Sequence, residues 1–189
     1  QVWAREAPVT SAGPHYPLPI SGEGSTGLGK ALKPITHPRR ADIPVMLGAE
    51  GPKNIAMAAE IADGWLPIFY APRLADMYNE WLDEGFARPG ARRTREDFEI
   101  CATANIVITE DRAAAFAAMK PYLALYMGGM GSEDTNFHAE VYRRMGYGEV
   151  VDDVTKLFRS GQKDKAGEII PDELVDDAAI VGDVDYVRK

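Results

Sequence analysis

The strongest candidate ligand site in this sequence is the turn GAEG at 48–51. It follows the apolar run IPVMLG at 43–48 and precedes a predicted helix whose first turn holds Pro52, where a missing N–H costs nothing. Free backbone N–H groups and the positive end of such a helix favour a phosphate or carboxylate. A plain strand-to-helix turn explains the same residues equally well. Glu50 suits an anion site only if it points to solvent, and Lys53 is a candidate to offset it.

A second glycine-rich stretch, GEGSTGLGK at 22–30, satisfies two bare nucleotide-binding patterns but lacks their context. A P-loop needs a preceding strand, a following helix and a hydroxyl residue after the lysine. Here Pro34 interrupts any helix, and Ala31 occupies the hydroxyl position. We interpret the stretch as a surface loop, in which Lys30 and Lys33 remain candidates to help hold an anion.

Other reactive side chains form no recognisable site. His15, His37 and His138 lack zinc-ligand spacing, so no metal site is predicted. Cys101 is interpreted as a buried strand residue and not as a nucleophile. The GGMG loop at 128–131 fits either a substrate pocket or the end of a helix. No catalytic residue is assigned.

Strand and helix patterns alternate along most of the chain. Apolar runs predict strands at 43–48, 65–69, 98–109 and 178–182. Amphipathic spacing predicts helices at 52–62, 72–87, 111–127 with a break near Pro121, 137–145, 149–160, 163–170 and 171–178, followed by a helix that Asp183 caps. Residues 1–42 are predicted to form a long connection rich in Pro and Gly, and 43–189 to form the βα units. This order implies an open doubly wound sheet or part of a (β/α)₈ barrel.

Composition restricts the class of partner. The net charge of −8 argues against nucleic-acid and anionic-membrane partners. No signal peptide or membrane span is recognisable, and one cysteine fits a reducing compartment, so a cytoplasmic location is expected. The acidic pairs at 152–153 and 176–177 are interpreted as solvated helix charges, and Asp63 as the end of a helix. Because the chain begins without Met and ends within a helix pattern, we expect a fragment.

Four blocks of sequence resemble a known family. The segment IPVMLGAEGPKNIAMAAEIADGWLPIFYAP resembles the luciferase-like flavin and deazaflavin oxidoreductases, especially the branch that uses coenzyme F420. The resemblance continues, in the same order, through GEGSTGLGKALKPITHPRRADIP, YLALYMGGMGSEDTNFHAEVYRRMGY and GQKDKAGEIIPDELVDDAAIVGDVDYVRK. It implies an α/β fold in which this chain is the C-terminal half of one (β/α)₈ TIM barrel, with the N-terminal half absent.

The resemblance also implies a function. It implies an F420-dependent oxidoreductase that transfers a hydride between the deazaflavin and a small organic substrate, with a homodimer as the full-length form. It implies that the phosphate-bearing tail of F420 is held by Gly48, Ala49, Glu50, Gly51 and Pro52. Catalytic groups are expected mostly in the absent half, so the isolated chain should show no turnover. An FMN-dependent luciferase-like monooxygenase and a non-catalytic flavin-binding relative remain alternatives.

Overall fold

The computed structural model describes residues 2–132 and 135–189, in two compact units, Gln1–Pro44 and Val45–Lys189. The described residues of the first unit form no helix or extended strand and are joined by antiparallel bridges at Val9–Leu32 and Ser11–Leu18. Gly22, Gly24, Gly27 and Gly29 all have positive φ values, which suits an irregular loop. The stretch at 22–30 therefore lacks the strand and helix of a P-loop.

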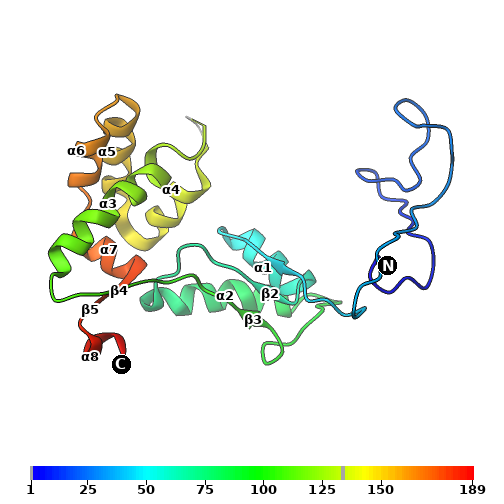
Figure 1. The fold of residues 1–189 in the computed structure, drawn as a ribbon, viewed down its shortest axis with the longest axis horizontal. Coiled ribbons are helices and arrows are strands. Elements are labelled where there is room, and N and C mark those ends of the chain that lie inside the picture. Colours follow the sequence, from blue (N-terminus) through cyan, green and yellow to red (C-terminus); the bar gives the residue numbers. More distant parts are fainter. Residues whose placement is uncertain (1, 133–134) are drawn as a thin grey trace. The chain divides into compact units, whose positions relative to one another are not determined.

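The second unit contains the regular elements (Figure 1). The strands are β1 (Met46–Leu47), β2 (Gly64–Trp65), β3 (Glu99–Ile100), β4 (Asn105–Ile108) and β5 (Ala179–Gly182). The helices are α1 (Pro52–Ile61), η1 (Pro72–Leu74), α2 (Ala75–Phe86), α3 (Arg112–Gly128), α4 (Phe137–Tyr142), η2 (Arg143–Tyr147), α5 (Gly148–Arg159), α6 (Lys163–Glu168), α7 (Asp172–Ala178) and α8 (Val184–Val187).

The strands pair in parallel, in two separate sheets. Strands β1, β2 and β3 are neighbours in that order, while β4 pairs with β5. The single strand predicted at 98–109 is therefore wrong, because the chain leaves the first sheet after Ile100 and joins the second at Asn105. The strand predicted at 65–69 ends at Trp65, before Pro67, which has no N–H to donate to a ladder.

Helices α1 and α2 pack closely beside the first sheet. Ile55, Ala58 and Ala59 of α1 are fully buried, as their helical spacing predicts. Gly85 of α2 lies against them: a Cβ on this residue would be 2.1 Å from the carbonyl oxygen of Ala56. The small side chains of both helices therefore set their separation.

Helices α3 to α7 form a second packed region, in which α3 lies beside α5 and α6 (Figure 1). Asp111 caps α3 by accepting a hydrogen bond from the backbone N–H of Ala114 at 2.9 Å. The predicted break near Pro121 is wrong, because α3 continues through it. Gly167 of α6 packs there, with its expected Cβ position 3.5 Å from the proline nitrogen.

The helix predicted at 137–145 also differs from the structure. Helix α4 ends at Tyr142, and the chain makes a wide turn through η2, in which Gly146 has φ +98°. Only glycine adopts this backbone conformation readily. Helix α5 then begins at Gly148. No helix among the described residues is long and apolar enough to cross a membrane.

Candidate functional site

The turn between β1 and α1 leaves backbone donors free at the start of the helix. Gly51, the residue before α1, has extended backbone angles and no side chain that caps the helix. The first hydrogen bond at this end runs from Ile55 N to Gly51 O at 2.9 Å. The N–H groups of Lys53 and Asn54 have no acceptor among the described residues. The predicted anion-binding geometry is therefore present.

Trp65 fixes the shape of this turn. Its indole Nε1–H donates to Ala49 O at 2.8 Å, and the ring is almost completely buried. The backbone N–H of Leu66 donates to Leu47 O at 2.9 Å. Because β1 and β2 are parallel, the turn and the segment after β2 lie at the same, carboxyl-terminal edge of the sheet. Ligand sites of parallel α/β proteins lie at that edge.

A cleft of about 490 Å³ opens at this edge. It is lined by Gly48, Ala49, Glu50, Gly51, Asn54, Leu66, Ile68, Phe137, His138, Glu140 and Arg144. Four of the five residues predicted to hold a cofactor thus line one cleft, while Pro52 begins α1 behind them. The first residues of α4 and the wide turn η2 supply the opposite side.

Arg144 is the arginine in this cleft, and sequence reasoning missed it. Its Nη1 lies 3.4 Å from Glu50 O, and its Nη2 lies 4.0 Å from the position a Cβ on Gly51 would take. No described carboxylate pairs with it, whereas the adjacent Arg143 pairs with Glu140 and Asp152. A guanidinium with unused donors beside free backbone N–H groups suits a phosphate.

Glu50 does not point to solvent, although the sequence predicts that it suits an anion site only if it does. Its Oε1 lies 2.8 Å from His138 Nδ1, and its Oε2 is buried without a hydrogen-bond partner among the described residues. Lys53, the predicted compensating charge, is exposed and does not line the cleft. The histidine takes that place because α4 folds back across the turn.

Asn136 holds α4 in position. Its Oδ1 accepts from Ala139 N, and its Nδ2 donates to the carbonyl oxygens of Tyr126 and Met127 at 2.8 and 2.9 Å. One side chain thus caps α4 and ties it to the end of α3. An Asn before an apolar helix pattern was the available sequence signal for this contact.

Aromatic rings surround His138 on the side away from the cleft. Tyr126 and Phe69 contact the imidazole edge to face, with ring centroids 4.9 and 6.2 Å away. Tyr142 packs on Phe69, and burial, followed by nearby Tyr122 and Glu50, raises its pKa strongly. Its hydroxyl is buried without a partner among the described residues. Tyr142 is therefore neutral at pH 7.

The GGMG loop at 128–131 does not line this cleft. Gly129 ends α3, and its N–H donates to Leu125 O at 2.7 Å, as the helix-end interpretation predicts. Gly128 and Gly129 pack against Phe158, whose ring occupies the space that their side chains would fill.

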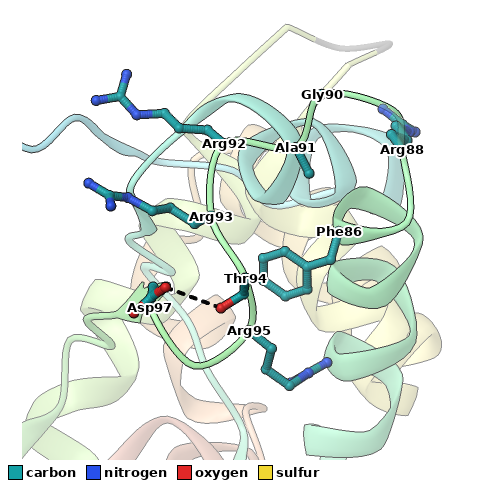
Figure 2. Close-up of a pocket in the computed structure, with 9 residues that line it drawn as sticks. All are labelled: Phe86, Arg88, Gly90, Ala91, Arg92, Arg93, Thr94, Arg95 and Asp97. Atoms are coloured by element: carbon teal, nitrogen blue, oxygen red, sulfur yellow. Dashed lines mark hydrogen bonds between the residues drawn. The ribbon is translucent and has the colours of Figure 1, made fainter.

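An arginine-rich loop between α2 and β3 lines another pocket, of about 480 Å³ (Figure 2). The side chains of Arg92 and Arg93 extend from the same side of this loop in Figure 2. Both pair with the buried carboxylate of Asp63, at 2.8 and 2.7 Å. Arg88 pairs with Glu60 and Glu84, and Arg95 with Asp83. All four guanidinium groups have carboxylate partners, so this loop is a poor anion site. The loop precedes the amino end of β3, a position that indicates a role in stabilising the sheet.

Cys101 is not the buried strand residue that was predicted. It follows β3 and is half-buried, with its thiol 3.3 Å from Glu99 Oε1. That hydrogen bond raises the pKa of Cys101, so the thiol stays protonated. Among the described residues, no group of three His, Cys, Asp or Glu side chains is placed to hold a metal ion.

Comparison with known proteins identifies the family. The family model for luciferase-like monooxygenases matches residues 1–189. The chain belongs to the luciferase-like monooxygenase family. It is 83% identical over 189 residues to "Putative coenzyme F420-dependent oxidoreductase Rv3520c" of Mycobacterium tuberculosis, covering 100% of this chain and 54% of that protein. It is 28% identical over 145 residues to 5,10-methylenetetrahydromethanopterin reductase of Archaeoglobus fulgidus, covering 77% of this chain and 42% of the reductase.

A solved structure shows the same fold. The coenzyme F420-dependent tetrahydromethanopterin reductase of Methanopyrus kandleri matches with a TM-score of 0.69 at 24% identity, over 98% of this chain and 48% of the reductase. The predicted fold class, an α/β luciferase-like barrel of which this chain forms a part, is confirmed. The chain spans about half the length of these relatives.

Proposed function

We propose that the full-length protein is a coenzyme F420-dependent oxidoreductase that transfers a hydride between the deazaflavin and a small organic substrate. The observation that carries the proposal is the cleft at 48–51, where an uncapped helix N-terminus and an arginine without a described carboxylate partner meet. The 83% identical relative, whose name refers to F420, supports this cofactor.

The residues of the cleft fit a phosphate-bearing cofactor. Lys53 N–H, Asn54 N–H and the Arg144 guanidinium supply donors, and Gly51 keeps the space between the turn and the guanidinium open. Leu66 and Ile68 add an apolar wall beyond this polar end. Tight binding at 48–52 requires that Glu50 be neutralised, for which His138 is placed.

These positions indicate which roles belong to the cofactor and which to the residues of this chain. When bound, the deazaflavin supplies the carbon that accepts or donates the hydride. The residues of this chain bind the phosphate-bearing tail and thereby orient the cofactor relative to the sheet. The described residues near the cleft include no group assigned to hydride or proton transfer, so the isolated 189-residue chain is expected to bind weakly and to show no turnover.

The remaining features of the proposal concern the whole protein. We expect a homodimer, a small-molecule substrate, and a cytoplasmic location that suits the single cysteine. Size-exclusion chromatography with light scattering on the full-length protein measures the first of these. A monomer at micromolar concentration would contradict it.

The experiment that tests the cofactor is a parallel titration of the full-length protein with F420 and FMN, followed by cofactor fluorescence. Saturable binding of F420 with FMN at least tenfold weaker is expected. Preference for FMN would assign the protein to the oxygen-using monooxygenases of the same family. Binding of neither would favour a non-catalytic barrel.

A further inference from the structure

A carboxylate lies inside the proposed anion site. Glu50 is part of the turn itself, and its side chain is only 19% exposed. Its Oε2 is buried with no partner among the described residues, so solvent screens this charge poorly. An anion that approaches the N–H groups of α1 is therefore repelled by Glu50 unless a positive charge neutralises it.

His138 is placed to supply that charge. Its Nδ1 lies 2.8 Å from Glu50 Oε1, and the ring lines the cleft. Asn136 fixes the helix that carries it, and Tyr126 and Phe69 hold the ring on its other side. Its Nε2 has no hydrogen-bond partner among the described residues.

We propose that His138 is a positioning residue for the anionic part of the cofactor. Its imidazolium form pairs with Glu50 and neutralises that carboxylate, so that cofactor binding takes up a proton. This inference rests on the proposed function and adds the residue that makes the turn electrostatically competent. Because only the protonated imidazole can neutralise Glu50, affinity should fall as the pH rises.

The charged and titratable groups that face this pair come from each surrounding element. Arg144 of η2 faces the turn, Glu140 of α4 lines the cleft, and Tyr126 of α3 and Tyr142 of α4 contact the aromatic cluster. Neither tyrosine lines the cleft, and both are neutral near pH 7, while the Glu50 charge helps to raise the pKa of Tyr142. Arg144 is held over the Glu50 backbone and not its carboxylate. Protonated His138 is thus the described cation in hydrogen-bond contact with that carboxylate.

The first test is calorimetric. F420 is titrated into the full-length protein at pH 7.5 in two buffers of different ionisation enthalpy, which gives the number of protons taken up on binding. A fractional net uptake is expected for the natural protein and none for His138→Gln. Equal heats in both buffers for the natural protein would overturn the inference while leaving F420 binding, and thus the proposed function, intact.

The second test separates charge compensation from a merely structural role. His138→Gln should weaken F420 binding about tenfold at pH 6.5, because it leaves Glu50 charged and uncompensated. Adding Glu50→Gln should then restore most of the affinity, since the repelling charge is gone. Failure of the double variant to bind more tightly than His138→Gln, with both variants folded by circular dichroism, would overturn the inference. Absence of F420 binding to the natural protein would overturn both proposals.

Discussion

Arg73 and Asp177 are 104 residues apart in the sequence and form a two-contact ion pair. Arg73 Nε lies 2.8 Å from Asp177 Oδ1, and Nη2 lies 2.7 Å from Oδ2. The same guanidinium donates to Met145 O at 2.7 Å, and the Tyr147 hydroxyl donates to Asp177 at 2.6 Å. This network joins the segment after β2 to α7 and to the wide turn that carries Arg144.

Replacing Arg73 by Lys should lower the free energy of unfolding by about 1–2 kcal/mol, because lysine cannot make the paired contacts. Burial alone would raise the pKa of Asp177. The hydrogen bonds from Arg73 and Tyr147 outweigh burial, so the pKa is lowered overall. The ionised Asp177 therefore stabilises the folded protein fully above the unfolded pKa of Asp, about 3.9. This stabilisation is lost as the pH falls through the lower folded pKa.

Urea unfolding at pH 7 and pH 3 measures this prediction. Arg112→Lys is the matched control, since its pair with Asp176 is about 40% exposed on both sides and should matter by less than about 0.5 kcal/mol. Equal losses for the two variants would refute a special role for the Arg73 network.

The sequence predicted the part of the site that is local. An apolar run, a glycine turn and Pro52 are consecutive, so their order indicates a strand, a turn and the start of a helix. His138 and Arg144 lie 88 and 94 residues from Glu50, and no periodicity brings them to it. Only the packing of α4 and η2 across the turn does so.

The errors have similar causes. Asp177 was taken for a solvated helix charge, since acidic pairs on helices usually are, but Arg73 and Tyr147 half-bury it. The apolar run at 98–109 fits one strand in composition, yet β3 and β4 find partners in different sheets. Which strands pair with one another depends on tertiary packing, and the pattern of apolar residues in the sequence does not encode it.

Gly51→Val should weaken F420 binding at least tenfold without unfolding the protein. Gly51 has extended backbone angles that valine adopts readily, and its nearest neighbour in the direction of a Cβ is Arg144 Nη2 at 4.0 Å. The branched side chain would fill the space proposed for the phosphate. Fluorescence titration measures the affinity, with Lys30→Ala as a control that should have a modest effect. Unchanged affinity in Gly51→Val would remove this turn from the cofactor site.

Arg144→Gln should weaken F420 binding roughly tenfold, which corresponds to about 1.4 kcal/mol. The variant keeps a hydrogen-bonding side chain but removes the guanidinium beside the free N–H groups. Arg143→Gln is the matched control, because this neighbour pairs with Glu140 and Asp152 and does not line the cleft. Raising the salt concentration should reduce the difference between the two variants. Equal affinities would show that Arg144 does not contact the anion.

Asp63→Asn should lower the free energy of unfolding by about 2–3 kcal/mol at pH 7. The buried carboxylate accepts hydrogen bonds from the Val45 backbone N–H, Arg92 and Arg93. An asparagine amide has only one accepting oxygen, and its NH₂ group cannot accept from these donors, so some of them would lose their partner. Burial alone would raise the pKa of Asp63, but these hydrogen bonds and charges lower it overall. Its contribution is therefore complete above about pH 4 and declines as the pH falls through the lower folded pKa.

The measurement is urea unfolding of Asp63→Asn and of the natural protein between pH 7 and pH 3. Their difference should narrow toward pH 3. Asp83→Asn, whose pair with Arg95 is largely exposed, serves as the control and should change stability little at either pH. A difference independent of pH would mean that the charge on Asp63 is not what the arginine loop stabilises.

Gly85→Ala sets helix propensity against packing. Alanine in a helix is favoured over glycine by about 1 kcal/mol. At Gly85 the new methyl group would lie 2.1 Å from Ala56 O and 2.6 Å from Ala59 Cβ, so α1 and α2 must separate. Overpacking of this kind costs about 1–3 kcal/mol, and a backbone oxygen cannot rotate away, so net destabilisation is expected.

The control for Gly85→Ala is Gly148→Ala, at the first residue of α5. There the backbone has φ −56°, and no atom of another part of the molecule lies within 4 Å of the added methyl group. That change should be neutral or stabilise by up to about 1 kcal/mol. Thermal unfolding of both variants measures the contrast. Equal shifts of the midpoint would mean that α1 and α2 can move apart freely, and the turn before α1 would then lose the rigid support on which its geometry depends.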